Sequence, residues 1–301
     1  MPHAFVTLDV FTKQIFGGNP LAVVFDAATL NDTAMQKIAR EFNLSETTFV
    51  LPPKHADNTH KVRIFTPVAE LPFAGHPTLG TAIALALASS PTQDRAEYRF
   101  EESVGVVPVS VSKTPDGVMR AELSVAQRPL NLPDTQPPAV WADILGLEES
   151  VVCPGDTQIG LWTCGTPFSF VPVSGLDSLG AAAVDMAGWR QHLNSEETTG
   201  VFVFTRETKD RAIDIRARMF APDHGIAEDP ATGSAVAALA GWLVDSDRPD
   251  DGTHRWSIAQ GVEMGRSSLL DLEADVKNGR ILGVRVGGCA VPVTTGMITD
   301  P

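Results

Sequence analysis

The sequence predicts an α+β fold of two similar domains, each a strand-rich barrel wrapped around a central apolar helix. Three observations lead to this prediction: an internal repeat, short strand-like runs in both halves, and one charge-free helical segment in each half. A helix without a polar face must be buried on all sides, and surrounding strands can bury it. An ordinary α/β sandwich is the alternative arrangement.

The internal repeat covers most of the chain. Residues 18–24 resemble 165–171 at an offset of 147, and residues 63–67 resemble 218–222 at an offset of 155. Residues 98–100 and 105–106 resemble 254–256 and 261–262 at an offset of 156. Gly75 matches Gly233 at 158, and the turns at Gly117 and Gly279 differ by 162. Such a drift indicates two copies that diverged through small insertions.

A proline-rich stretch separates the two copies. Residues 128–140 contain four prolines, which remove backbone donors and predict an extended connector. We therefore expect a first domain over residues 1–128 and a second over 129–301. The C-terminal tail could pack on the first domain.

The elements of the first copy follow from periodicity. Apolar or alternating runs predict strands at 4–10, 21–25, 47–51 and 61–65, and Asn31 is a suitable cap for a helix over 32–42. The charge-free segments 77–88 and 235–244 predict the two buried helices.

Composition narrows the class of protein. The net charge of -14 disfavours nucleic acid or an anionic membrane as a partner. The three cysteines are odd in number and lack C-x-x-C spacing, which argues against a disulfide framework or a zinc site: Cys153, Cys164 and Cys289. Without a signal-like N-terminus or an apolar run of about 18 residues, we expect a soluble cytoplasmic protein.

Each buried helix begins in a segment rich in Gly, Pro, Thr and Ser. The first-turn amides and the helix dipole favour an anion there, so the two starts could hold a small carboxylic acid between the halves. At the first start, the dipole should keep His76 neutral. At the second, Asp229 is better placed as cap and site residue than Glu228, for which an electrostatic role at the helix terminus is more common.

Glu46 enters an apolar strand and lacks an acidic counterpart near Thr198 and Thr199 of the second copy. A structural role would tend to recur in both copies, so a lone acid suggests proton transfer. Partial burial would raise its pKa toward the range that a general acid or base needs.

These segments together resemble the PhzF-like phenazine-biosynthesis family, from about Val6 to Arg266. The matching motifs are residues 16–20 (FGGNP), 45–50 (SETTFV), 72–78 (PFAGHPT), 228–235 (EDPATGSA) and 260–261 (QG). The resemblance implies the diaminopimelate-epimerase-like fold, a homodimer, and isomerisation of trans-2,3-dihydro-3-hydroxyanthranilate without a metal or organic cofactor.

The resemblance also implies roles for the site residues. Glu46 would shuttle a proton between two ring carbons, while His76 and Asp229 would hold polar groups of the substrate. Substrate binding would further involve Asn19, Gly75, Gly233 and Ser234, with the last three supplying amides to the carboxylate. Epimerases of this fold place one cysteine at each helix start, where this chain has glycines.

Two alternatives remain open from the sequence. One is a small-acid epimerase or racemase that uses Glu46 with His76 or Asp229 as opposing bases. The other is a non-catalytic binding protein that retains the same cleft.

Overall fold

The computed structural model describes residues 2–89, 95–133, 136–193 and 198–299, and the chain divides into two compact units. The first unit comprises Met1–Ser124 and Gly287–Pro301, and the second comprises Val125–Val286. The boundary thus falls at residues 124 and 125, and the C-terminal segment belongs to the first unit. Strand β17 (Arg280–Ile298) runs through both units.

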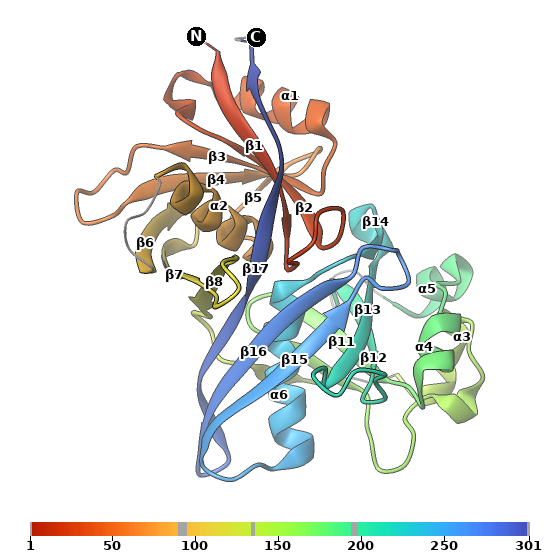
Figure 1. Cartoon of the computed structure of the whole chain (residues 1–301). Helices are drawn as coiled ribbons and strands as arrows, with labels where there is room; N and C mark the ends of the chain where they lie inside the picture. The colour runs from red at the N-terminus through yellow and green to blue at the C-terminus, as the bar shows by residue number, and fades with distance from the viewer. Residues whose placement is uncertain (1, 90–94, 134–135, 194–197, 300–301) are drawn as a thin grey trace. The chain divides into compact units, whose positions relative to one another are not determined.

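The first unit combines strands with two helices, one of which is apolar and largely buried. In Figure 1, β17 lies beside β1, with which it pairs antiparallel. The helices are α1 (Asp32–Phe42) and α2 (Gly75–Ala88). The strands are β1 (His3–Val10), β2 (Asn19–Val24), β3 (Glu46–Leu51), β4 (His60–Phe65), β5 (Glu70–Leu71), β6 (Arg95–Glu102), β7 (Gly105–Lys113) and β8 (Met119–Ser124).

Strand β3 is buried on both faces because it lies between two helices. Phe49 packs in a cluster with Met35 and Ile38 of α1. Thr48, on the opposite face, places its Oγ1 2.8 Å from Oγ1 of Thr81 on α2. Since side chains alternate along a strand, every second residue of β3 faces α2.

The second unit has the same kind of core. Its helices are α3 (Pro138–Leu145), α4 (Leu176–Ala181), α5 (Met186–His192) and α6 (Gly233–Asp247). Its strands are β9 (Leu130–Leu132), β10 (Gly160–Thr163), β11 (Pro167–Pro172), β12 (Gly200–Thr205), β13 (Ile215–Ala221), β14 (Ile226–Asp229), β15 (Gly252–Gln260) and β16 (Ser268–Lys277).

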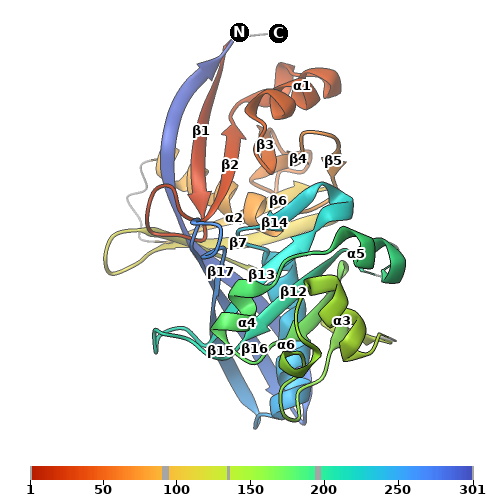
Figure 2. The ribbon, with the colours of Figure 1, turned by 90° about the vertical axis from the view of Figure 1, so that its right-hand side faces the viewer.

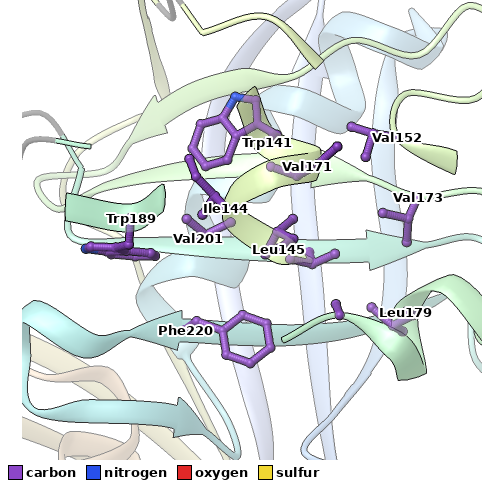
Figure 3. Close-up of a cluster of buried hydrophobic side chains, with 13 residues drawn as sticks. Trp141, Ile144, Leu145, Val152, Val171, Val173, Leu179, Trp189, Val201 and Phe220 are labelled. Atoms are coloured by element: carbon purple, nitrogen blue, oxygen red, sulfur yellow. The ribbon is translucent and has the colours of Figure 1, made fainter. Parts of the chain in front are cut away.

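Helices cover both faces of β12. On one face Val201 packs against Trp141 and Leu145 of α3 and Trp189 of α5, as Figure 3 shows. Figure 2 shows α3, α4 and α5 on the same side of this unit. On the other face Phe204 stacks edge-on against Trp242 of α6, with ring centroids 4.8 Å apart. Because both faces are covered, all six residues of β12 are buried.

The two units repeat one strand order. Within the first, β1–β2, β3–β4, β4–β5 and β6–β7 are antiparallel while β2–β3 and β4–β6 are parallel. Within the second, β10–β11, β12–β13, β13–β14 and β15–β16 are antiparallel while β11–β12 and β13–β15 are parallel. Two residues, one from each unit, are called corresponding positions below when the equivalent strand pairings or the starts of the two apolar helices align them.

The secondary-structure predictions succeed best where caps and periodicity agree. Helix α1 spans Asp32–Phe42, and Asn31 Oδ1 accepts a hydrogen bond from Ala34 N as expected. Both apolar helices are present, each beginning two residues earlier than predicted. The extended connector is wrong in part, because Pro138 begins α3: proline lacks only an N–H that the first helical turn leaves unpaired. No helix in the described residues is long and apolar enough to cross a membrane.

Candidate active site

Glu46 and His76 meet inside the first unit. Oε2 of Glu46 lies 3.2 Å from Nε2 of His76, and both residues are buried. The strand and helix spacings explain the contact. From Thr48 back to Glu46, β3 spans about 6.7 Å. From Thr81 back to His76, α2 spans about 7.5 Å. The two distances are similar, so Glu46 and His76 lie at the same level along β3 and α2, counted from the Thr48–Thr81 contact.

His76 is neutral, as predicted, but burial and not the helix dipole is the cause. Burial lowers the pKa of its imidazole to about 3, although a hydrogen bond to the Pro20 backbone carbonyl opposes this shift. The cause is therefore the loss of water around the ring. A neutral imidazole that donates to Pro20 presents its second nitrogen to Glu46 as an acceptor.

Asn19 supports the strand that carries Glu46. It is fully buried at the start of β2, and its Oδ1 accepts a hydrogen bond of 2.9 Å from Ser45 Oγ. Ser45 directly precedes Glu46, so Asn19 holds the entry of β3.

The start of α2 has no side-chain cap. Ala74 is the N-cap residue and Gly75 the first helical residue, half-buried. Thr78 Oγ1 lies 2.8 Å from the Ala74 carbonyl, one turn back. First-turn amides without a capping side chain suit an anion.

In the second unit, hydrogen bonds among Asp229, Thr232 and Gln260 hold the start of α6 in place. Oδ2 of the buried Asp229 accepts a hydrogen bond of 2.5 Å from Thr232 Oγ1. Gln260 donates from Nε2 to the Asp229 carbonyl at 2.7 Å and to Thr232 Oγ1 at 3.0 Å. Its Oε1 accepts from Thr232 N at 3.2 Å. Gly233 is buried and Ser234 half-buried at the first turn of α6.

Glu228 has a structural partner. Its carboxylate oxygens accept bonds of 2.8 and 2.9 Å from Arg218. In the first unit the corresponding pair is Arg63 with Glu70, at 2.7 and 2.6 Å. Because this contact is present in both units, we assign Glu228 to the fold and leave it outside the candidate site.

The titratable candidate residues Glu46, His76 and Asp229, in contrast, have no like counterparts. The ladder registers place Gly200 at the position of Glu46 and Leu71 at the position of Asp229. His76 corresponds to Ser234, next to the first glycine of each helix. A Cβ at Gly200 would lie 2.8 Å from the Phe220 carbonyl oxygen, so a side chain does not fit there. Gly200 lies just beyond the Thr198–Thr199 position expected from sequence; Glu196 and Glu197 lie outside the described residues.

Sequence reasoning missed Glu102, which is buried at the end of β6. The pairing of β4 with β6 and of β13 with β15 aligns Glu102 with Gln260. The two residues are 158 positions apart, whereas the sequence repeat gave an offset of 156 for the same strand. The signal was present: Tyr98, Phe100 and Glu102 share the buried face of an alternating strand, so the last of them is an inward-facing acid.

No group of three His, Cys, Asp or Glu side chains in the described part of the chain is placed to hold a metal ion. The cysteines lie outside both apolar helices, and burial raises the pKa of the Cys164 thiol to about 12.

Comparison with known proteins agrees with this architecture. Residues 8–296 match the family described as phenazine biosynthesis-like protein. An uncharacterized isomerase of Mesorhizobium japonicum is 40% identical over 98% of both chains. The trans-2,3-dihydro-3-hydroxyanthranilate isomerase of Pseudomonas chlororaphis is 34% identical over 98% of this chain and 99% of its own. The Bacillus anthracis PhzF-family protein has the same fold, with a TM-score of 0.90 at 24% identity over 100% of both chains.

These findings define the class as an isomerase with a strand-rich barrel fold and accompanying helices. The chain belongs to the phenazine biosynthesis-like protein family.

Proposed function

We propose that the chain is a cofactor-independent isomerase of a small carboxylic acid and that one glutamate, Glu46, moves the proton. The observation that carries the proposal is the buried contact of 3.2 Å between Glu46 and His76. The corresponding position in the other unit has no room for an acid. By analogy with the Pseudomonas relative, trans-2,3-dihydro-3-hydroxyanthranilate is the first substrate to test.

In the proposed reaction the Glu46 carboxylate takes a proton from one ring carbon, so a C–H bond breaks and an O–H bond forms. The electron pair spreads through the conjugated part of the substrate. The Glu46 carboxyl, whose proton exchanges with water, then gives a proton to another ring carbon, which regenerates the carboxylate and leaves the composition of the substrate unchanged. No redox partner is required for this proton shift.

The remaining residues are assigned to binding. Once Glu46 carries the proton taken from the substrate, it can donate to the Nε2 acceptor of the neutral His76 imidazole. His76 and Asp229 contact polar groups of the substrate. Amides at Gly75, Gly233 and Ser234 hold its carboxylate, and positive potential at a helix start stabilises the charge that develops during proton transfer. Asn19 contributes to binding through the placement of Ser45 and Glu46.

An epimerase is a weaker candidate for Glu46 and His76. Inversion of a stereocentre needs two bases on opposite sides of one carbon, whereas these two groups touch each other. With a pKa of about 3, His76 is also a poor base near neutral pH.

The test is deuterium incorporation in D2O, followed by NMR of the product with wild type, Glu46→Gln and the surface control Glu97→Gln. We expect turnover and ring deuteration with wild type and the control, and neither with Glu46→Gln. Full exchange with Glu46→Gln would rule out the mechanism. If wild type does not convert this substrate, a panel of cyclic amino acids and hydroxy acids is screened for exchange. Binding without exchange across that panel would favour a binding protein.

We also infer that the two units arose by duplication and that, as the family resemblance implies, the enzyme is a homodimer. Light scattering on the purified chain measures the oligomeric state directly.

A further inference from the structure

Glu102 is a buried carboxyl that the proposed reaction does not use. It ends β6 and faces the first turn of α2, where its Oε1 lies 2.8 Å from Thr78 Oγ1. Its Oε2 is buried and has no hydrogen-bond partner within the described residues. An ionised carboxylate with one oxygen unpaired in such a place would be strongly destabilised.

Proton counting points to the neutral carboxyl. The Thr78 hydroxyl lies 2.8 Å from two acceptors, the Ala74 carbonyl and Glu102, but carries a single proton. If Glu102 is protonated, it donates to Thr78 Oγ1, and the Thr78 hydroxyl donates to Ala74. Every proton in this chain then has an acceptor. If Glu102 is ionised, the two acceptors compete for the one hydroxyl proton.

In the second unit an amide, which does not titrate, takes the place of the Glu102 carboxyl. Gln260, at the corresponding position, donates to Thr232 Oγ1 at 3.0 Å, and Thr232 is the N-cap residue of α6. In both units the end of the hairpin strand is therefore tied to the N-cap of the apolar helix. The amide donor cannot be lost with pH, whereas a carboxyl donor can.

We propose that Glu102 is a positioning residue that, only while protonated, fixes the Ala74–Gly75 peptide at the start of α2 through Thr78. The Ala74 carbonyl and the Gly75 N–H belong to one peptide group, so a bond to the carbonyl sets the direction of the amide. Loss of the Glu102 proton turns the Thr78 hydroxyl away from Ala74 and loosens the Gly75 amide. The effect on substrate rests on the proposed function, while the titration and stability effects do not.

The electrostatic surroundings allow this titration near neutral pH. Burial raises the pKa of Glu102 to about 8, and the hydrogen bond from Thr78 lowers it by a smaller amount. Glu102 lines a hollow of about 610 Å³ that also contains Lys54, His55, Lys61 and Glu101. None of these is a cause of the shift. The Glu101 carboxylate accepts hydrogen bonds from the Lys54 and His55 amides.

The other charged groups of this hollow are paired with one another: Arg63 binds Asp32 and Glu70. On α2, which packs against this face, the one titratable side chain is His76, which is neutral. The alkaline titration is therefore assigned to Glu102 itself.

The direct experiment is a carboxyl titration by 13C NMR on the whole chain labelled at Glu Cδ. The Glu102 signal is assigned by its absence in Glu102→Gln. We expect a carboxyl signal that titrates near pH 8 in wild type and is missing from Glu102→Gln. A wild-type protein in which the signal lost in Glu102→Gln does not titrate near pH 8 would overturn the proposal.

Stability gives a second readout that needs no substrate. The folded pKa of Glu102 lies above its unfolded value, so its contribution is present below about pH 4.5 and lost as pH rises to about 8. Relative to Glu102→Gln, the Tm of wild type should fall by roughly 3–6 °C between pH 5 and pH 9. Glu97→Gln, an exposed residue of the same strand, should keep the wild-type slope.

Binding separates positioning from a merely structural role. Using 2-aminobenzoate as an unreactive carboxylate probe, wild type should bind about tenfold more weakly at pH 9 than at pH 7, because only the protonated fraction is competent. Glu102→Gln should bind equally at both pH values, Thr78→Val weakly at both, and Thr78→Ser like wild type. If Glu102 titrates as expected but Glu102→Gln keeps the alkaline loss of binding, the positioning role is wrong while the proposed function stands.

Discussion

The start of α2 in the first unit and the start of α6 in the second are built from the same strand order but carry different side chains. At four corresponding positions the first unit has Glu46, Leu71, His76 and Glu102, while the second has Gly200, Asp229, Ser234 and Gln260. The Arg–Glu pairs next to them are alike. We expect the recurring ion pairs to hold the fold and the differing side chains to carry the chemistry. Each of the following experiments changes either a recurring residue or a differing one.

The largest effect on stability should come from a recurring pair. Arg218 binds Glu228 and also donates to three backbone carbonyls, with side-chain exposures of 11% for Arg218 and 16% for Glu228. Arg218→Ala should lower the free energy of unfolding by about 3–5 kcal/mol because it leaves a buried charge and carbonyls unpaired. The carbonyls are those of Leu179, Gly180 and Ala182.

Arg63→Ala is the matched control, measured by urea unfolding beside it. Its partners are more exposed, with Asp32 at 83% and Glu70 at 35%, so we expect a loss of about 1 kcal/mol. Equal losses would show that corresponding pairs contribute equally despite their different burial.

The next effect tests a differing position. His76→Ser gives the first unit the side chain of the second and removes the imidazole that lies 3.2 Å from Glu46. Because general acid–base residues contribute about 10²–10⁴-fold, we expect kcat to fall by about 10²- to 10³-fold on the substrate of the proposed reaction.

Ser234→Ala, at the corresponding position, should change kcat by less than about tenfold and act mainly on KM, since its assigned role is binding. If both variants lose kcat alike, the proton chemistry is not confined to the first unit.

The recurring part of the molecule was the easier part to predict from sequence. Local signals are sufficient for α1, because Asn31 caps it, and for the two apolar helices, because they lack charge. Glu46 could be singled out because the repeat offers no like residue, and Asp229 because it directly precedes Pro230 at a helix start. Glu102 could not be recognised from adjacent letters, since Glu101 beside it faces outward and only the strand alternation separates them. The hydrogen bonds from Gln260 to Thr232 and from Ser45 to Asn19 join residues far apart in the sequence, so no local pattern predicts them.

A smaller effect is expected at Gly200. An added Cβ would lie 2.8 Å from the Phe220 carbonyl oxygen and 3.1 Å from Met219 Sδ, and backbone cannot yield as a flexible side chain does. Gly200→Ala should therefore lower stability by about 2–3 kcal/mol through overpacking. The test is thermal and urea unfolding, with Gly180→Ala as control because nothing lies within 4 Å of its Cβ position. If Gly200→Ala is as stable as wild type, lack of space does not explain why the second unit has no counterpart of Glu46.

The smallest effect is the acid dependence of stability that His76 introduces. Its pKa of about 3 in the folded chain lies below the unfolded value of about 6.5, so the unfolded chain binds the extra proton between these values. Stability should therefore fall as pH falls, by about 2 kcal/mol between pH 7 and pH 5. Urea unfolding across this range should show a flatter profile for His76→Ser and an unchanged one for the exposed control His55→Ser. Glu102 has the opposite effect, because its contribution to stability is lost as pH rises. Removing Glu102 should therefore make stability fall less at alkaline pH, and removing His76 should make it fall less at acid pH. A wild-type profile unaffected by His76→Ser would mean that the ring is not buried in its neutral form, and the difference between the two helix starts would then not extend to their protonation.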